Sequence, residues 1–248
     1  MQKKISIITV VKNGMPYLKS ALKIFHKQKY KNKEIIIIYS KSTDGTLEFL
    51  KKNKKKYNKL IIDKDSKNKF GSLNIGIKKS KGDVVGILHS DDIYPNNNIL
   101  EDIMKIFNNK KIDIVYGNTV FCKKENQNKI IRIWKSNKFK YSDLKYGWMP
   151  PHTTLYISKK IISKNLYSLK YPISGDYKFI LDLFSKKNIK TEYLNKNLIK
   201  MRSGGDSTRI NNIAKKFIED IKIAKKYFKF YYICIIFKIL RKIKQFTF

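Results

Sequence analysis

The sequence is poor in acidic residues and in cysteine. Only 19 of its 248 residues are Asp or Glu, against 55 Lys and Arg, so its formal charge is +36. The two cysteines, Cys122 and Cys234, are too few for a disulfide framework or a zinc site, and they fit a reduced, cytoplasmic compartment. The positive charge favours a polyanionic partner, such as a phosphorylated substrate, an anionic membrane or nucleic acid. A biased base composition, which spreads lysine along the whole chain, explains part of the same excess.

The sequence also lacks a long apolar run. The longest candidate, residues 231–237, ends at Lys238, well short of the roughly 20 residues that a membrane-spanning helix needs. The first residues show no cleavage signal of a secretory leader. Hydrophobic residues still make up 42% of the chain and aromatic residues 13%. We therefore expect a folded protein with a substantial core, and not a disordered or membrane-spanning chain.

Short apolar runs alternate with amphipathic segments in the first half of the chain. The pattern predicts strands at 5–11, 34–40, 60–63, 83–89 and 112–121, and helices at 15–28, 42–53, 71–80 and 97–109. This order predicts an α/β fold whose mostly parallel central sheet is flanked by helices. Later segments are predicted as an irregular aromatic stretch at 134–158, a helix at 174–187, a strand and a glycine turn at 191–208, and a basic helical region at 212–246.

Two adjacent acids, Asp91 and Asp92, follow a strand that is otherwise apolar. Neighbouring carboxylates beyond a strand end are costly unless positive charge lies beside them. A hard divalent cation such as Mg²⁺ or Mn²⁺ supplies that charge and also binds phosphate oxygens. Ligands of such sheets bind beyond the carboxyl ends of the strands, so we expect residues 40–44 and 90–92 to meet at one edge. The alternative is that both acids only cap the following turn, which Pro95 shapes.

Six segments, in order, resemble the family 2 glycosyltransferases, which have the GT-A fold. They are ISIITVVKNG (5–14), STDGTLEFL (42–50), NIGIKKSKGDVVGILHSDDIY (74–94), MPPHTTLYISKK (149–160), SGDYKF (174–179) and KMRSGGDST (200–208). The similarity covers nearly the whole chain and is greatest to bacterial enzymes that build capsule, O-antigen or exopolysaccharide. It implies a GT-A domain over 1–208, divided into a nucleotide-sugar-binding half (1–121) and an acceptor-binding half (122–208), and followed by a basic helical tail (209–248).

The resemblance implies an inverting transfer of a sugar from a nucleoside diphosphate sugar to a hydroxyl of a glycan acceptor, one linked to a lipid. HSDD at 89–92 is similar to the family's DXD-type motif, with His89 where many members have Asp. By this match Asp92 holds Mn²⁺ or Mg²⁺, and Asp91 contacts the ribose or sugar of the donor. The other residues that it assigns to the nucleotide-sugar site are Thr9, Val11, Asn13, Ser40, Asp44, Asn74, Ser90 and Arg202.

The chain departs from the family pattern at two positions. Members often carry an acid shortly before the STDGT turn, where it reads the base, but this chain has Tyr39, Ser40 and Lys41 there. Gly71 stands where related chains tend to have Asp. The identity of the donor base therefore stays open. The missing acid also motivates an alternative hypothesis, a non-catalytic homologue that only binds sugar nucleotides.

An inverting displacement needs a general base that takes the proton of the acceptor hydroxyl. Asp176, at the start of the predicted helix 174–187, matches the acid that does this in the family, and Asp182 is the second candidate. The alternative is that Asp176 only complements the helix dipole. His152 matches a position beside the acceptor or the metal. Arg202 and the glycine turn after it are expected to bind diphosphate oxygens, unless the turn is only a surface loop.

The tail interleaves lysine and arginine with aromatic residues, a composition typical of helices in a membrane interface. We expect residues 212–228 to pack on the catalytic domain and residues 229–248 to contact anionic lipid. The enzyme would then work at the cytoplasmic face of the membrane, as a peripheral protein.

A nucleic-acid-binding protein is the alternative that the charge suggests, but we find no recognition module for it. Nucleotidyl transfer would require a glycine-rich loop with Lys after the first strand, which VVKNGMPY does not provide.

Overall fold

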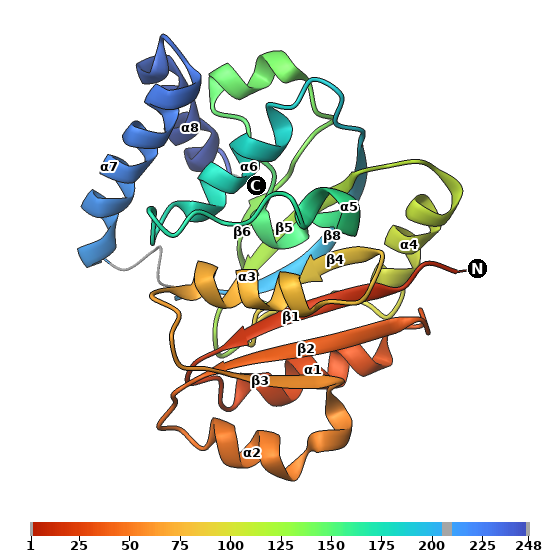
Figure 1. Cartoon of the computed structure of the whole chain (residues 1–248). Helices are drawn as coiled ribbons and strands as arrows, with labels where there is room; N and C mark the ends of the chain where they lie inside the picture. Colours follow the sequence, from red (N-terminus) through yellow and green to blue (C-terminus); the bar gives the residue numbers. More distant parts are fainter. Residues whose placement is uncertain (1, 205–209, 247–248) are drawn as a thin grey trace.

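The computed structural model describes residues 2–204 and 210–246, in which one β-sheet lies between layers of helices (Figure 1). The strands are β1 (Ile5–Val11), β2 (Lys33–Ser40), β3 (Lys59–Asp63), β4 (Val84–Ile87), β5 (Ile114–Cys122), β6 (Ile130–Trp134), β7 (Tyr156–Ser158) and β8 (Thr191–Arg202). The α-helices are α1 (Tyr17–Lys27), α2 (Thr46–Lys52), α3 (Lys69–Lys79), α4 (Ile99–Asn109), α5 (Lys159–Ile162), α6 (Gly175–Phe184), α7 (Ile210–Tyr227) and α8 (Tyr231–Ile243). All elements predicted within the first 121 residues are present, with ends that differ by a few residues.

The strands follow the order β3-β2-β1-β4-β7-β5-β6, and β8 pairs with β5. Strands β1 to β4 run parallel to their neighbours in this group, and β8 runs parallel to β5. Only β6 and β7 run against the strands beside them. The prediction of an α/β fold with a mostly parallel central sheet is therefore confirmed.

Hydrophobic side chains on the two faces of the sheet form two cores. Along β1, Ile7 belongs to the core beneath α1 and α4, whereas the next residue, Ile8, belongs to the core beneath α3 and α6. Both side chains are completely buried. A strand covered on both faces needs an unbroken run of apolar residues, and this is why ISIITVV forms a central strand. Each such isoleucine stabilises the fold by about 1.5–3 kcal/mol.

The region after residue 121 contains more regular structure than its sequence predicts. Strand β7 is only three residues long and fills the space between β4 and β5, with Val85 opposite Ile157 and Val115 opposite Tyr156. Strand β6 extends the sheet beyond β5. The pairing partners of both strands are distant in the sequence, so local patterning does not reveal them. Short 3-10 helices, η2 (Tyr141–Tyr146) and η3 (His152–Thr154), account for much of the remaining aromatic stretch.

The basic tail forms two helices, α7 and α8, and both lie beside α6 (Figure 1). Helix α8 packs on η2, and Gly147, which ends η2, makes this contact possible. It has a φ of +65°, and a Cβ atom there would lie 2.6 Å from the carbonyl oxygen of Cys234. None of the helices formed by residues 2–204 and 210–246 has the length and apolar character needed to cross a bilayer. The tail thus packs on the domain along much of its length, beyond the predicted portion 212–228.

Candidate functional site

The carboxyl ends of β1, β2 and β4 lie together at one edge of the sheet because the three strands are parallel and adjacent. The loops that follow them carry residues 12–16, 41–45 and 88–92. The β1 and β4 loops touch at Gly14, where an added Cβ atom would lie 3.5 Å from the Cβ of Ser90. The expectation that residues 40–44 and 90–92 share one edge agrees with this arrangement.

Hydrogen bonds join the loop after β1 to the loop after β2. The N–H of Asn13 donates to Oγ of Ser42 (3.0 Å), and the side-chain oxygen of Asn13 accepts from the N–H of Thr43 (2.9 Å). Asn13 has a φ of +51°, in the left-handed region that Asn tolerates better than most residues. Asn13 is exposed at this edge of the sheet.

Asp44 is the main link between these two loops. One carboxylate oxygen accepts the N–H of Met15 (2.7 Å), and the other accepts Oγ1 (2.6 Å) and the N–H (3.2 Å) of Thr46. Burial by itself raises the pKa of Asp44, but these hydrogen bonds outweigh it and hold the pKa below its usual range. Asp44, which was predicted to contact the nucleotide, thus already accepts three hydrogen bonds from groups within the protein.

The HSDD turn contains two acids in different environments. The Asp91 side chain is half-buried, whereas Asp92 is only 1% exposed, and among the described residues its Oδ2 atom has no hydrogen-bond partner. Burial raises the pKa of Asp92 well above its usual range, and the charge of Asp91 adds to this, while Arg202 acts in the opposite direction. Asp91 is therefore the more accessible acid, although the family match assigns the metal to Asp92.

Arg202, at the end of β8, supports the HSDD turn. Its Nη1 donates to the main-chain carbonyl oxygen of Asp91, and its Nη2 donates to Oγ of Ser20 at 3.2 Å. The guanidinium carbon lies 4.6 Å from the centre of the Tyr17 ring, and the residue is 5% exposed. Its side chain is thus held against the backbone of the turn, and little of it is accessible to a diphosphate. The glycine turn after Arg202 was expected to bind the diphosphate together with it. Residues 205–208 of this turn lie outside the described residues.

Asn74 and His152 both bind Tyr167, which the sequence analysis does not single out. The Asn74 side chain donates to the carbonyl oxygen of Tyr167 (2.8 Å) and accepts its N–H (2.8 Å). Nε2 of His152 lies 2.5 Å from the Tyr167 hydroxyl, and the Tyr167 ring stacks on Phe179 of α6 at 3.9 Å between centroids. Asn74 therefore fixes the segment that carries Tyr167, and its amide is occupied by that backbone.

Asp176 lies in the first turn of α6 with a half-buried side chain. Burial lowers the pKa of His152 to about 4, and the charge of Asp176 opposes this shift while His89 contributes to it. The 3-10 helix η3, which contains His152, packs against both β4 and α6. Elements from the first and second halves of the predicted site thus meet at η3.

Three further predicted residues lie at the ends of β1 and β2. Thr9 and Val11 are completely buried, and within residues 2–204 and 210–246 the hydroxyl of Thr9 has no hydrogen-bond partner. Ser40 is half-buried at the end of β2, and its carbonyl oxygen accepts from the Ser42 hydroxyl at 2.8 Å. Thr9 and Val11 therefore lie beneath the edge of the sheet, behind the more exposed Asn13.

Among the residues that the structure describes, no group of three or more His, Cys, Asp or Glu side chains is arranged to hold an ion. The two carboxylates of HSDD, one of them with an unpartnered buried oxygen, fit a different kind of site. In that kind, one or two protein carboxylates and the phosphates of a substrate share a Mg²⁺ or Mn²⁺ ion.

Comparisons with known proteins agree with the predicted family and fold. The model of glycosyl transferase family 2 matches residues 6–167. An uncharacterized glycosyltransferase of Haemophilus influenzae is 30% identical over 194 residues, which cover 77% of this chain and 74% of that protein. The Escherichia coli UDP-Glc:alpha-D-GlcNAc-diphosphoundecaprenol beta-1,3-glucosyltransferase WfaP is 29% identical over 188 residues, which cover 73% of this chain and 70% of WfaP.

Solved structures with the same fold include S. aureus TarS 1–349 in complex with UDP-GlcNAc, with a TM-score of 0.68, 16% identity and 90% of this chain covered. Mannosyltransferase PcManGT from Pyrobaculum calidifontis, in complex with GDP-Man and Mn²⁺, has a TM-score of 0.64, 12% identity and 91% of this chain covered. This chain spans 66% and 64% of those two solved chains, somewhat less than two thirds of each. At such identities the likeness shows the fold alone, which is the GT-A fold. Taken with the match of the family model, it shows that the chain belongs to glycosyl transferase family 2 and is a glycosyltransferase.

Proposed function

We propose that this glycosyltransferase moves a sugar, with inversion, from a nucleoside diphosphate sugar to a hydroxyl of a lipid-linked glycan in the synthesis of a bacterial surface polysaccharide. The observation that carries the proposal is the packing of η3, which contains His152, against both β4, which leads into the HSDD turn, and α6, which carries Asp176. Inversion by a single displacement requires a general base on the side of the sugar opposite the departing diphosphate, and therefore apart from the groups that bind the donor. Complexes of structural neighbours with UDP-GlcNAc and with GDP-Man and Mn²⁺ support a donor of this class.

On the donor side, Asp91 is the acid of the HSDD turn with the more accessible carboxylate. We assign the contact with a Mn²⁺ or Mg²⁺ ion to this turn, through the accessible Asp91 carboxylate and the Oδ2 atom of Asp92, which hydrogen-bonds to none of the described residues. When bound, the ion offsets the charge that develops on the departing diphosphate. Arg202 holds the backbone of the turn, and its charge opposes the rise in the pKa of Asp92 that burial causes. Asn13 and Ser40 are the accessible polar residues at the edge of the sheet for the nucleoside.

On the acceptor side, the Asp176 carboxylate takes the proton of the attacking hydroxyl. The hydroxyl oxygen forms a bond to the anomeric carbon, while the bond from that carbon to the diphosphate oxygen breaks and the electron pair leaves with the diphosphate. Asp182 is less suited to this role because its carboxylate pairs with Lys178 (2.5 Å) and accepts the hydroxyl of Tyr227. His152 is uncharged at neutral pH because its pKa is about 4, so it is suited to hydrogen-bond a sugar hydroxyl rather than to bind an anion.

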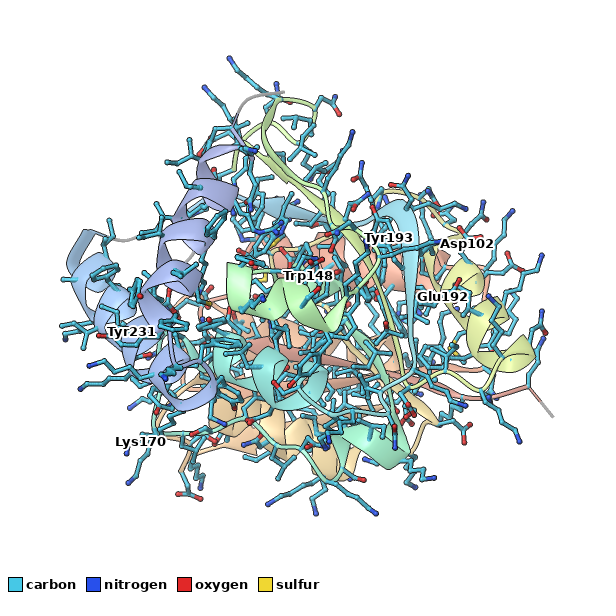
Figure 2. The ribbon with its side chains drawn as sticks, turned by 90° about the horizontal axis from the view of Figure 1, so that it is seen from above. Asp102, Trp148, Lys170, Glu192, Tyr193 and Tyr231 are labelled. Carbon is cyan, nitrogen blue, oxygen red and sulfur yellow. The ribbon has the colours of Figure 1, made fainter. Side chains whose placement is uncertain are left out.

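The lipid-linked acceptor and the membrane association rest on WfaP and on the surface of helix α8. The full name of WfaP describes a diphosphoundecaprenol-linked acceptor. Helix α8 exposes a stripe of apolar side chains at helical spacing: Tyr232, Ile236, Ile239, Leu240 and Ile243. Lys242 and Arg241 are exposed beside this stripe. Figure 2 shows Tyr231 of the same helix at one edge of the molecule, opposite the edge with Asp102 and Glu192. This combination suits a surface that rests on anionic lipid.

The proposal is tested with UDP-, GDP- and dTDP-sugars, each with Mn²⁺ or with EDTA. We expect one nucleotide sugar to raise the melting temperature of the protein and to be hydrolysed slowly, with both effects dependent on the ion. Asp91→Asn is expected to lose the ion-dependent stabilisation, whereas Asp65→Asn, an exposed acid in another loop, serves as the matched control. If no nucleotide sugar binds or is hydrolysed, the proposed function is contradicted.

A further inference from the structure

The residues that lead into α6 are held by a side chain of the tail. The Oε2 atom of Glu219, on α7, accepts the N–H groups of Ser174 (2.7 Å) and Ile173 (3.1 Å). The Ser174 hydroxyl completes the contact by donating to the carbonyl oxygen of Lys216 at 3.4 Å. These two N–H groups come immediately before the helix that carries Asp176 in its first turn. The carboxylate of a residue more than 40 positions away thus fixes how α6 begins.

An ion-pair network holds the same end of α6 from α8. The Asp220 carboxylate accepts from Lys216 (2.8 Å) and pairs with Lys238 (2.9 Å), and it is 8% exposed. The Lys238 ammonium also lies 3.3 Å from the ring centre of Tyr177, the residue after Asp176. Both tail helices therefore contact the first turn of α6 or the residues just before it. Because these charges are largely buried, the loss of one partner leaves the other uncompensated.

We propose that Glu219 is a positioning residue for the transfer reaction and acts through Asp176. This inference rests on the proposed function, in which Asp176 takes the proton of the acceptor. A general base must hold its carboxylate within hydrogen-bond distance of the acceptor hydroxyl, and small displacements lower the rate strongly. Glu219 fixes two peptide groups within three residues of Asp176. The tail would thus serve catalysis directly, in addition to any contact with a membrane.

The test compares Glu219→Ala and Glu219→Gln with the parent. Glu101→Ala, which removes an exposed acid from α4, is the matched control. Hydrogen exchange is measured across residues 173–180, and turnover is measured with UDP-GlcNAc or GDP-mannose, whichever the parent uses. Glu219→Ala is expected to exchange about tenfold faster at Ile173 and Ser174, since both amides lose their acceptor. Its turnover is expected to fall about tenfold, with the KM for the donor within about twofold of the parent. Glu219→Gln keeps an acceptor oxygen and is expected to recover most of both losses.

A double variant separates positioning from general folding. In the Asp176→Asn background, adding Glu219→Ala is expected to cause no further loss of turnover, because the group that it positions is already absent. Unchanged exchange at residues 173–174, or a donor KM that rises as much as turnover falls, overturns the inference. A further loss of turnover in the double variant also overturns it. Full activity of the single variant Asp176→Asn would instead contradict the assignment of Asp176 as the general base. The failure of the proposed function is therefore distinguishable from the failure of the positioning role of Glu219.

Discussion

Arg202 donates a hydrogen bond from Nη1 to the main-chain carbonyl oxygen of Asp91. The same guanidinium donates to Ser20 of α1 and lies over the ring of Tyr17. A single buried cation therefore ties the end of β8 to the HSDD turn and to α1, across 111 residues of sequence between Arg202 and Asp91. The orientation of the Asp91 carboxylate depends on this tie, since a turn held by its backbone presents its side chain in a fixed direction.

Arg202→Lys should be destabilising, although it preserves the charge. Lysine lacks the planar fork that makes both hydrogen bonds and the ring contact. We expect a loss of about 1–3 kcal/mol in the free energy of unfolding, measured by urea denaturation, and weaker binding of the donor. Arg241→Lys, at an exposed position of α8, is the control and should change stability by less than about 0.5 kcal/mol. Equal stability of the two variants would contradict the role assigned to Arg202.

Asp44→Ala should loosen the contact between the loops after β1 and β2. The N–H of Met15 and both donors of Thr46 lose their acceptor, at a cost of about 2 kcal/mol in the free energy of unfolding. The pKa of Asp44 is lower in the folded protein than in the unfolded chain, so its contribution is complete above pH 3.8 and is lost as the pH falls further. Urea denaturation at pH 7 checks the effect. Asp65→Ala, an exposed acid in the loop after β3, should be nearly neutral.

His152 should make the protein less stable in mild acid. Its pKa is about 4 in the folded protein against 6.5 for an ordinary histidine, so between these values the unfolded chain binds the proton more readily. Stability therefore falls as the pH decreases from about 6.5 to about 4, by about 3 kcal/mol from this residue. The free energy of unfolding is measured at pH 7 and at pH 4.5 for the parent and for His152→Gln. The decrease between the two pH values should be smaller for His152→Gln than for the parent. The same difference in both proteins would show that His152 is not the responsible group.

The alternation of apolar runs and amphipathic helices was sufficient to predict the parallel half of the sheet, because β1, β2 and β4 are buried on both faces and therefore read as unbroken apolar runs. The helix at 174–187 was also visible, since its pattern is local. Strand β7 was missed because its three residues form a strand only between β4 and β5. The break between α7 and α8 was missed because residues 228–230 contain neither Pro nor Gly.

The residues of the site could be predicted only in part. The HSDD acids and Asp176 belong to recognisable motifs, so the sequence predicts that they are site residues. It does not predict that Asp92 is buried while Asp91 is only half-buried. Tyr167 and Glu219 carry no local signal, since each acts on a residue 15 or more positions away. Asn74 appears in a motif, yet its amide binds backbone rather than solvent or ligand.

The apolar stripe of α8 should determine binding to anionic vesicles. Ile236→Asp with Leu240→Asp places two acids among side chains that are 54% and 47% exposed. We expect at least about tenfold weaker binding to vesicles of phosphatidylglycerol and phosphatidylcholine, because apolar burial is lost and the new charges are repelled. Ile62→Asp changes an isoleucine of β3 that is equally exposed, at 54%, and should bind like the parent. Binding that is unchanged in the double variant would exclude the stripe as the lipid contact.

The division of labour between Asp91 and Asp176 is tested most directly by measuring donor affinity and turnover on the same Asp176→Asn sample. Calorimetry with the nucleotide sugar and Mn²⁺ gives the affinity, and release of the nucleoside diphosphate in the presence of acceptor lipid gives the turnover. We predict affinity within about twofold of the parent and a loss of turnover of at least about 100-fold, as expected when a general base is removed. Turnover equal to that of the parent, or a loss of donor affinity that accounts for the whole effect, would contradict the account.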